Sequence, residues 1–139
     1  MTENGNCTYI VSCVSAKSEY SCEAGEMYQS VWFKKAIEFI GARDYYIISA
    51  KYGLLHPHDF IQPYNLSLYD LDVKTRVEWG KSVSKSIQKK IPYNQTIVFL
   101  AGKTYIKYII GHLNNYKVGT PLKGLGIGQQ LKWFGDNTL

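Results

Sequence analysis

The stretch Ile47–Leu68 reads IISAKYGLLHPHDFIQPYNLSL and carries the clearest fold signal in the chain. Just before and within it, residues 45–48 form an apolar, β-branched run with the length of a buried strand. The run ends at Ser49–Gly53, where small residues, a cation and a glycine stand together. Glycine tolerates positive φ, so we expect Gly53 to turn the chain. A buried strand that ends in small, polar and cationic residues is typical of ligand sites in open α/β sheets.

Strands and helices alternate on both sides of this stretch. Besides residues 45–48, the predicted strands are residues 8–14, 96–100 and the short segment 116–121. The predicted helices are residues 24–40, 72–91, 106–113 and 124–133. This alternation predicts a single α/β domain over residues 1–139, Rossmann-like or doubly wound, with three layers and a mainly parallel sheet.

Composition and charge restrict the class of protein. The chain has 139 residues, of which 45% are hydrophobic and 19% charged, and this balance is typical of a globular domain with a sizeable core. The net charge of +5 suits anionic partners such as nucleotides or nucleic acid. Cys7, Cys13 and Cys22 lack CxxC spacing, and no secretory segment or long apolar span is present. We therefore expect free thiols in a cytoplasmic protein without membrane contact, and we leave a homo-oligomer open.

Three lysines suggest an anion site. Lys17, Lys51 and Lys103 each follow a predicted strand. Strand-to-helix junctions of a parallel sheet lie at one edge, where helix N-termini and lysines attract anions. The sequence therefore predicts a phosphate site at the C-terminal edge of the sheet. The alternative is that these lysines are ordinary exposed loop residues.

Further candidate binding residues lie near the same predicted edge. We expect hydroxyl and backbone groups there to donate hydrogen bonds, and Tyr64 or Tyr105 to pack on a base or sugar. Cys13 lies where a lysine and a helix N-terminus could activate its thiol, but a buried structural cysteine is the favoured interpretation. Besides Lys17 and Lys51, the complete set of candidate ligand-binding residues is Ser12, Cys13, Ser49, Tyr52, Gly53, Tyr64, Gly102 and Tyr105.

Two other motifs have simpler interpretations. His56-Pro57-His58-Asp59 contains residue types that bind metals, but no fourth donor is clustered with them, so we interpret it as a solvated loop and expect no metal or cofactor. Gly124–Gly128 resembles a dinucleotide fingerprint, but it lies far from the first strand, so a tight terminal turn is the better interpretation. Asp59 is the least implausible catalytic carboxylate, because no pair of carboxylates follows the predicted strands.

The most specific pattern in the chain is Ser49–Gly53 followed by Gln62-Pro63-Tyr64. Further characteristic positions are Cys13, Lys17, Arg76, Trp79, Gly102, Tyr105, Pro121, Gly124, Gly128 and Trp133. Over nearly its whole length the chain resembles, in these positions, a widespread uncharacterised family of bacteria and phages. That family is itself similar to the YaaA peroxide-stress protein family.

The resemblance and the residues together leave three hypotheses. The first is binding of a nucleotide or nucleoside-like phosphorylated ligand, with cleavage or transfer at an N-glycosidic bond if the protein is an enzyme. The second is a non-catalytic sponge that sequesters a signalling nucleotide, which the occurrence of the family in phages implies. The third is a nucleic-acid-binding stress protein, because YaaA proteins are associated with DNA binding and protection from oxidative damage.

Overall fold

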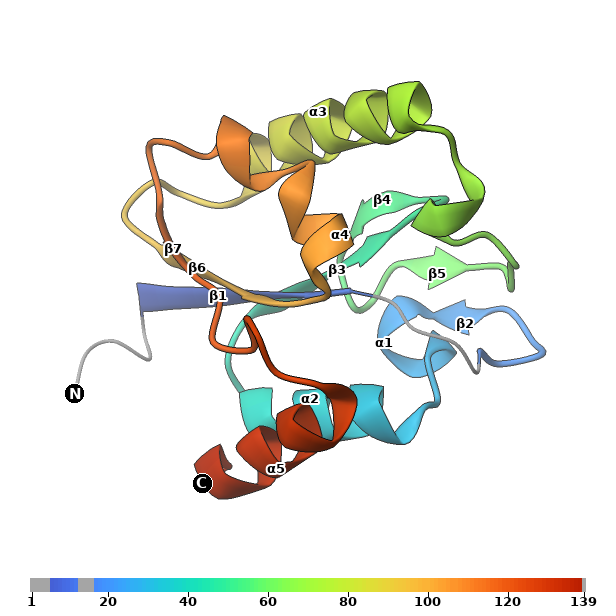
Figure 1. Ribbon diagram of the computed structural model, residues 1–139. Coiled ribbons are helices and arrows are strands. Elements are labelled where there is room, and N and C mark those ends of the chain that lie inside the picture. Colours follow the sequence, from blue (N-terminus) through green and yellow to red (C-terminus); the bar gives the residue numbers. More distant parts are fainter. Residues whose placement is uncertain (1–5, 13–16, 139) are drawn as a thin grey trace.

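A five-stranded sheet forms the centre of the computed structural model, which describes residues 6–12 and 17–138 (Figure 1). Its strand order is β4-β3-β1-β6-β7. The strands are β1 (Cys7–Ser12), β3 (Tyr45–Ser49), β4 (Gly53–Leu55), β6 (Thr96–Leu100) and β7 (Lys117–Gly119). β1 is parallel to β3 and β6, β6 is parallel to β7, and β4 alone is antiparallel to its neighbour. The predicted α/β class with a mainly parallel sheet is confirmed.

Helices cover both faces of this sheet (Figure 1). One face carries α2 (Val31–Ile40) and α5 (Ile127–Asn137), and the other carries α3 (Val73–Lys90), α4 (Lys103–Lys107) and the short 3₁₀ helix η3 (Ile110–His112). Side chains alternate along a strand, so β1 supplies both cores. Tyr9 and Val11 pack with α2 and α5, whereas Ile10 packs with α3. The result is three layers.

The helix predicted over residues 24–40 is wrong as a single element. The chain forms α1 (Ala24–Met27), leaves the helical conformation at Tyr28 and starts again at α2. The Ser30 hydroxyl caps α2 by accepting the Phe33 N–H at 3.1 Å, which is a typical helix start. The remaining elements are β2 (Cys22–Glu23), which pairs with β5 (Phe60–Ile61), and the 3₁₀ helix η2 (Leu68–Asp70).

The connections define where a ligand would bind. After β1 the chain crosses one face through α2 to reach β3, and after β6 it continues through α4 on the opposite face. β1 and β6 are hydrogen-bonded neighbours. In open α/β sheets, the crevice beyond the carboxyl ends of two such neighbours is the usual ligand site.

The sequence predicted Lys51 at a strand-to-helix junction, and this prediction is wrong. β3 turns directly into the antiparallel β4, and Ser49 pairs with Gly53 across this hairpin. The predicted turn at Gly53 is confirmed, since its φ is +74°. The hairpin leaves Lys51 exposed on the turn itself. Lys51 is therefore not structurally equivalent to Lys17 and Lys103.

We expect Gly53→Ala to lower the free energy of unfolding by about 1 kcal/mol or more. The added Cβ would meet only Val83 Cγ2, at an ordinary 3.9 Å, so the cost comes from the positive φ. Urea denaturation of the variant and of Gly111→Ala measures it. Gly111 lacks a positive φ, and a Cβ there would meet no atom within 4 Å. Equal losses in both variants would contradict the argument.

The longest helix, α3, carries the charge excess of the protein. Its 18 residues include six basic side chains (Lys74, Arg76, Lys81, Lys85, Lys89 and Lys90) and one acidic side chain, Glu78. This excess of five equals the net charge of the whole chain. Across residues 6–12 and 17–138, no helix is both long and apolar enough to cross a membrane.

Candidate functional site

A cleft of about 550 Å³ opens beyond the carboxyl ends of β1 and β6. One wall, here called the helix wall, consists of Ser30, Trp32, Ile127 and Gln130 from the starts of α2 and α5. The opposite wall, here called the loop wall, consists of Asn65, Leu66, Ser67 and Tyr69 from the segment before α3, with Gly102 and Tyr105. Ser12 and Lys17 line the cleft between the walls.

Ser12 is the last residue of β1 and is only 4% exposed. This residue lines the cleft, and within residues 6–12 and 17–138 its hydroxyl makes no hydrogen bond that the structure records. Ser12 therefore offers a hydrogen bond to a molecule in the cleft.

The helix wall brings two helix N-termini to the same cleft. α2 starts after Ser30, α5 starts at Ile127, and the first turn of neither helix contains an acidic side chain. Backbone N–H groups at the start of a helix lack intrahelical partners and lie at the positive end of its dipole. Such ends bind phosphate and other anions. Two of them beside one cleft favour an anionic ligand.

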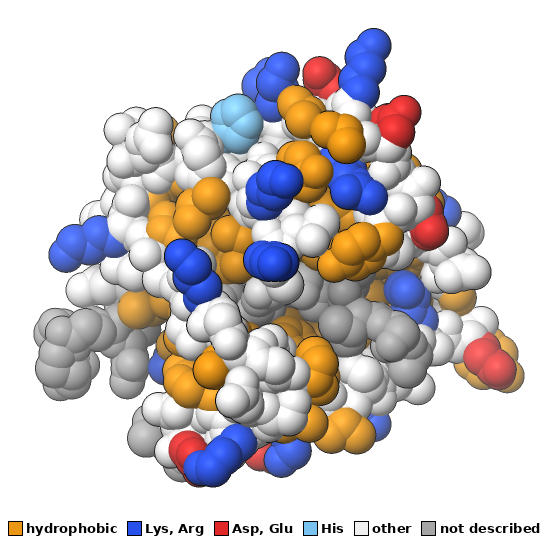
Figure 2. Space-filling view, viewed as in Figure 1, with side chains coloured by type: hydrophobic (Ala, Val, Ile, Leu, Met, Phe, Trp, Pro, Cys, Tyr) orange, Lys and Arg blue, Asp and Glu red, His pale blue; other side chains and the backbone are white. Residues whose placement is uncertain are grey.

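Lys17 adds a full positive charge to this cleft. Its backbone is fixed by a bridge to Tyr28 and by the Ser18 N–H, which donates to the Met27 carbonyl at 2.7 Å. Its ammonium nitrogen lies 4.8 Å from the centre of the Tyr64 ring, a cation–π contact that orients the side chain. Basic side chains lie over the middle of the face seen in Figure 2, and acidic side chains lie near its outline.

Ser49 and Tyr64 stabilise the position of the Lys17 side chain without lining the cleft. Ser49 is fully buried, and its hydroxyl donates to the Tyr64 hydroxyl at 2.8 Å. The same Ser49 oxygen accepts the N–H groups of Lys51 and Tyr52 at 3.2 and 3.1 Å. The hydroxyls of Tyr64 and Tyr28 lie 2.7 Å apart. These contacts fix the hairpin and the Tyr64 ring but place Ser49 and Tyr64 outside the cleft lining.

The two halves of the most specific sequence pattern meet in space. The Tyr52 hydroxyl lies 3.3 Å from both the backbone nitrogen and the carbonyl oxygen of Gln62. The Tyr52 and Tyr64 rings pack edge to face with centroids 5.4 Å apart. The pattern therefore joins the β3–β4 hairpin to the segment that continues into the loop wall.

The remaining predicted binding residues are divided between the cleft and its surroundings. Gly102 caps α4 and lines the cleft. Tyr105 also lines it, but this residue is 7% exposed, its ring packs edge to face on Trp79, and its hydroxyl accepts the Leu68 N–H at 3.3 Å. Lys51 lies outside the lining, with its nitrogen 5.3 Å from the Tyr52 ring centre.

The structure tests two of the three cysteines that the sequence predicts as free thiols. Cys7 and Cys22 are free thiols, as predicted. Cys13, which the sequence also predicts as a free thiol and as a candidate ligand-binding residue, lies outside the described residues.

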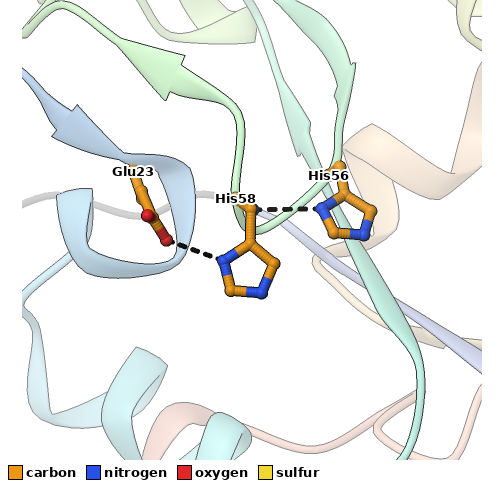
Figure 3. A network of polar contacts seen from close by, with 3 residues as sticks. All are labelled: Glu23, His56 and His58. Atoms are coloured by element: carbon orange, nitrogen blue, oxygen red, sulfur yellow. Dashed lines mark hydrogen bonds and ion pairs between the residues drawn. The ribbon is translucent and has the colours of Figure 1, made fainter.

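The His56–Asp59 motif forms a separate surface turn (Figure 3). His58 Nδ1 lies 2.7 Å from Glu23 Oε1, and the His58 N–H donates to His56 Nδ1 at 3.1 Å. Asp59 Oδ2 accepts the His56 N–H at 2.9 Å, so this carboxylate stabilises the turn and lies outside the cleft lining. In the part of the chain that the structure describes, no three His, Cys, Asp or Glu side chains cluster as metal ligands would.

Eight cleft residues have no counterpart among the predicted binding residues: Ser30, Trp32, Asn65, Leu66, Ser67, Tyr69, Ile127 and Gln130. Ser30 was detectable, because serine before an apolar helical run is an N-cap signal. Ile127 lies in the glycine-rich segment Gly124–Gly128, which opens α5 beside the cleft. Asn65 and Tyr69 carry no local signal, since only the path of their loop brings them to the cleft.

Two comparisons with known proteins place these features in context. The model of a family described as "Family of unknown function (DUF6884)" matches residues 8–136. A "UPF0246 protein" of Psychrobacter cryohalolentis is 33% identical over 85 residues, which cover 54% of this chain and 31% of that protein. The chain thus spans about a third of the length of this relative. The second match agrees with a distant similarity to the YaaA proteins.

Proposed function

The chain belongs to the DUF6884 family, whose function is unknown, and we propose that it binds a nucleotide or nucleoside-like phosphorylated ligand in its cleft, in the cytoplasm. The observation that supports this most is the convergence on one cleft of two helix N-termini, Lys17 and the Ser12 hydroxyl. Phosphate oxygens accept hydrogen bonds from such donors, and the charge of Lys17 strengthens them. The cleft also lies where open α/β sheets bind nucleotides.

The lining favours binding over turnover. The described residues of the two walls, with Ser12 and Lys17, include no Asp, Glu or His. General acid–base chemistry most often uses such groups within hydrogen-bond reach of the substrate, and the titratable side chains of the described lining are Lys17, Tyr69 and Tyr105. We therefore propose a protein that holds its ligand intact, as a nucleotide sponge does, and we keep cleavage at an N-glycosidic bond as the competing outcome.

Equilibrium dialysis against a mixture of nucleoside monophosphates and cyclic nucleotides tests the proposal. The protein is then denatured, and the released compounds are identified by mass spectrometry. Recovery of an intact nucleotide supports binding without turnover. Recovery of a free base with a ribose phosphate would identify N-glycosidic cleavage instead, and failure to retain or convert any nucleotide would contradict both.

A second candidate, sequence-independent binding of nucleic acid, is favoured by α3. The helix carries the whole charge excess, and Lys81, Lys85 and Lys89 follow one another at four-residue spacing on its exposed side. Residues at this spacing lie on one face of a helix, where they can meet successive phosphates. The test is the salt dependence of binding to a labelled duplex. Changing these three lysines to Gln should reduce the slope of the logarithm of the binding constant against the logarithm of the salt concentration. The same change at Lys34, Lys35 and Lys123 should not reduce it.

A further inference from the structure

The loop wall contains an aromatic ring that is accessible to solvent. Tyr69 lines the cleft, yet 65% of this residue is exposed. The two tyrosines that the sequence suggested for contact with a base have packed rings instead. Tyr64 lies outside the cleft lining with the Tyr52 ring against it, and Tyr105 is buried and packs on Trp79. Tyr69 therefore offers the accessible aromatic surface of the loop wall.

The Tyr69 side chain is held in place although it is exposed. Its hydroxyl donates to Thr104 Oγ1 at 3.3 Å, and its N–H donates to the Ser67 hydroxyl at 3.1 Å. The Arg76 guanidinium lies 5.9 Å from the ring centre, and Arg76 Nε donates to the carbonyls of Leu68 and Leu71, each at 2.9 Å. A ring that is already ordered loses little conformational entropy when a flat group stacks on it.

Asn65 lines the same wall and is exposed. Within residues 6–12 and 17–138, its side-chain amide makes no hydrogen bond that the structure records. A side-chain amide presents a donor and an acceptor side by side, the arrangement that pairs with the polar edge of a nucleobase. The helix wall, by contrast, offers helix N-termini suited to phosphate.

From this division of the cleft we infer that the loop wall binds the base of the ligand. The base stacks on Tyr69, Asn65 hydrogen-bonds its edge, and the phosphate lies against the helix wall. The inference rests on the proposed function and restricts its ligand class. A nucleotide should bind through both walls, whereas a sugar phosphate, which lacks the base, should bind through the helix wall alone.

Calorimetric titration with the four ribonucleoside 5′-monophosphates and with ribose 5-phosphate tests the inference. We expect the nucleotides to bind more tightly than ribose 5-phosphate. Tyr69→Ala should weaken binding of the nucleotides about fivefold or more, the usual contribution of one stacked base, and leave ribose 5-phosphate unaffected. Tyr69→Phe, which keeps the ring and loses only the hydrogen bond to Thr104, should retain most of the wild-type affinity. Tyr20→Ala is the matched control, because Tyr20 is 76% exposed and lies outside the cleft lining.

The outcomes separate this inference from the proposed function. Equal affinity for ribose 5-phosphate and the nucleotides, or equal losses for both in Tyr69→Ala, would overturn the base-binding role of the loop wall but retain a phosphate site. Failure of every phosphorylated probe to bind the wild-type protein would overturn the proposed function as well. Asn65→Ala adds a separate readout, since it should reduce the differences in affinity among the four nucleotides.

Discussion

Replacing Gly80 with alanine is expected to destabilise the domain by about 3 kcal/mol or more, at the upper end of the cost of overpacking. Gly80 is buried in the middle of α3, where the helix crosses the segment after α4. A Cβ at this position would lie 2.0 Å from the carbonyl oxygen of Tyr108 and 2.7 Å from its carbonyl carbon. Both are backbone atoms, so relief requires α3 or the segment at Tyr108 to move.

Urea denaturation followed by circular dichroism measures this loss. The matched control is Gly135→Ala in α5, where an added Cβ would meet no atom within 4 Å. Alanine is a better helix former than glycine, so the control should be neutral or more stable by up to about 1 kcal/mol. A similar stability for both variants would show that α3 does not pack as closely on Tyr108 as the structure indicates.

The second large effect is expected at Lys17. Lys17→Ala should weaken binding of a nucleotide tenfold or more, which corresponds to about 1.4 kcal/mol, because it removes the cation from the cleft lining. The melting temperature in the absence of ligand should stay close to that of the wild type. Fixation of the backbone by the bridge to Tyr28 does not depend on the side chain.

Lys51→Ala is the control for Lys17→Ala. It removes the same charge from the exposed hairpin turn, outside the cleft lining. Titration of both variants with a nucleotide recovered from the dialysis experiment should leave Lys51→Ala near the wild-type affinity. A larger loss in Lys51→Ala than in Lys17→Ala would place the phosphate site at the hairpin instead of the cleft.

The main features of the fold could be predicted because they depend on local patterns. The buried strands appear as apolar runs, and the long helix α3 appears as periodic apolar residues from its N-cap, Asp72, to Ile91. β4 could not be predicted, since its three residues, Gly53–Leu55, are too few for a period-two pattern. The break between α1 and α2 was hidden because apolar spacing continues through Tyr28–Ser30.

The candidate site was predicted mainly from residues that follow the strands. Ser12 and Gly102 come next to the ends of β1 and β6, so a parallel sheet places them at one edge. The position of Tyr69 depends instead on Arg76 in the first turn of α3, whose guanidinium donates hydrogen bonds to the carbonyls of Leu68 and Tyr69. Such long-range contacts leave no periodic signal in a single sequence. For the same reason, nothing in the sequence showed that Ser49 hydrogen-bonds Tyr64 instead of lining the cleft.

The two outermost strands of the sheet, β4 and β7, have a consequence for association between copies of the chain. Each has only three residues, and β4 is the second arm of a tight hairpin. An incoming strand needs a longer row of unpaired backbone groups to form a stable ladder, and short edge strands are one means by which proteins prevent such pairing. We therefore expect the folded protein to resist fibril growth by strand addition at either edge.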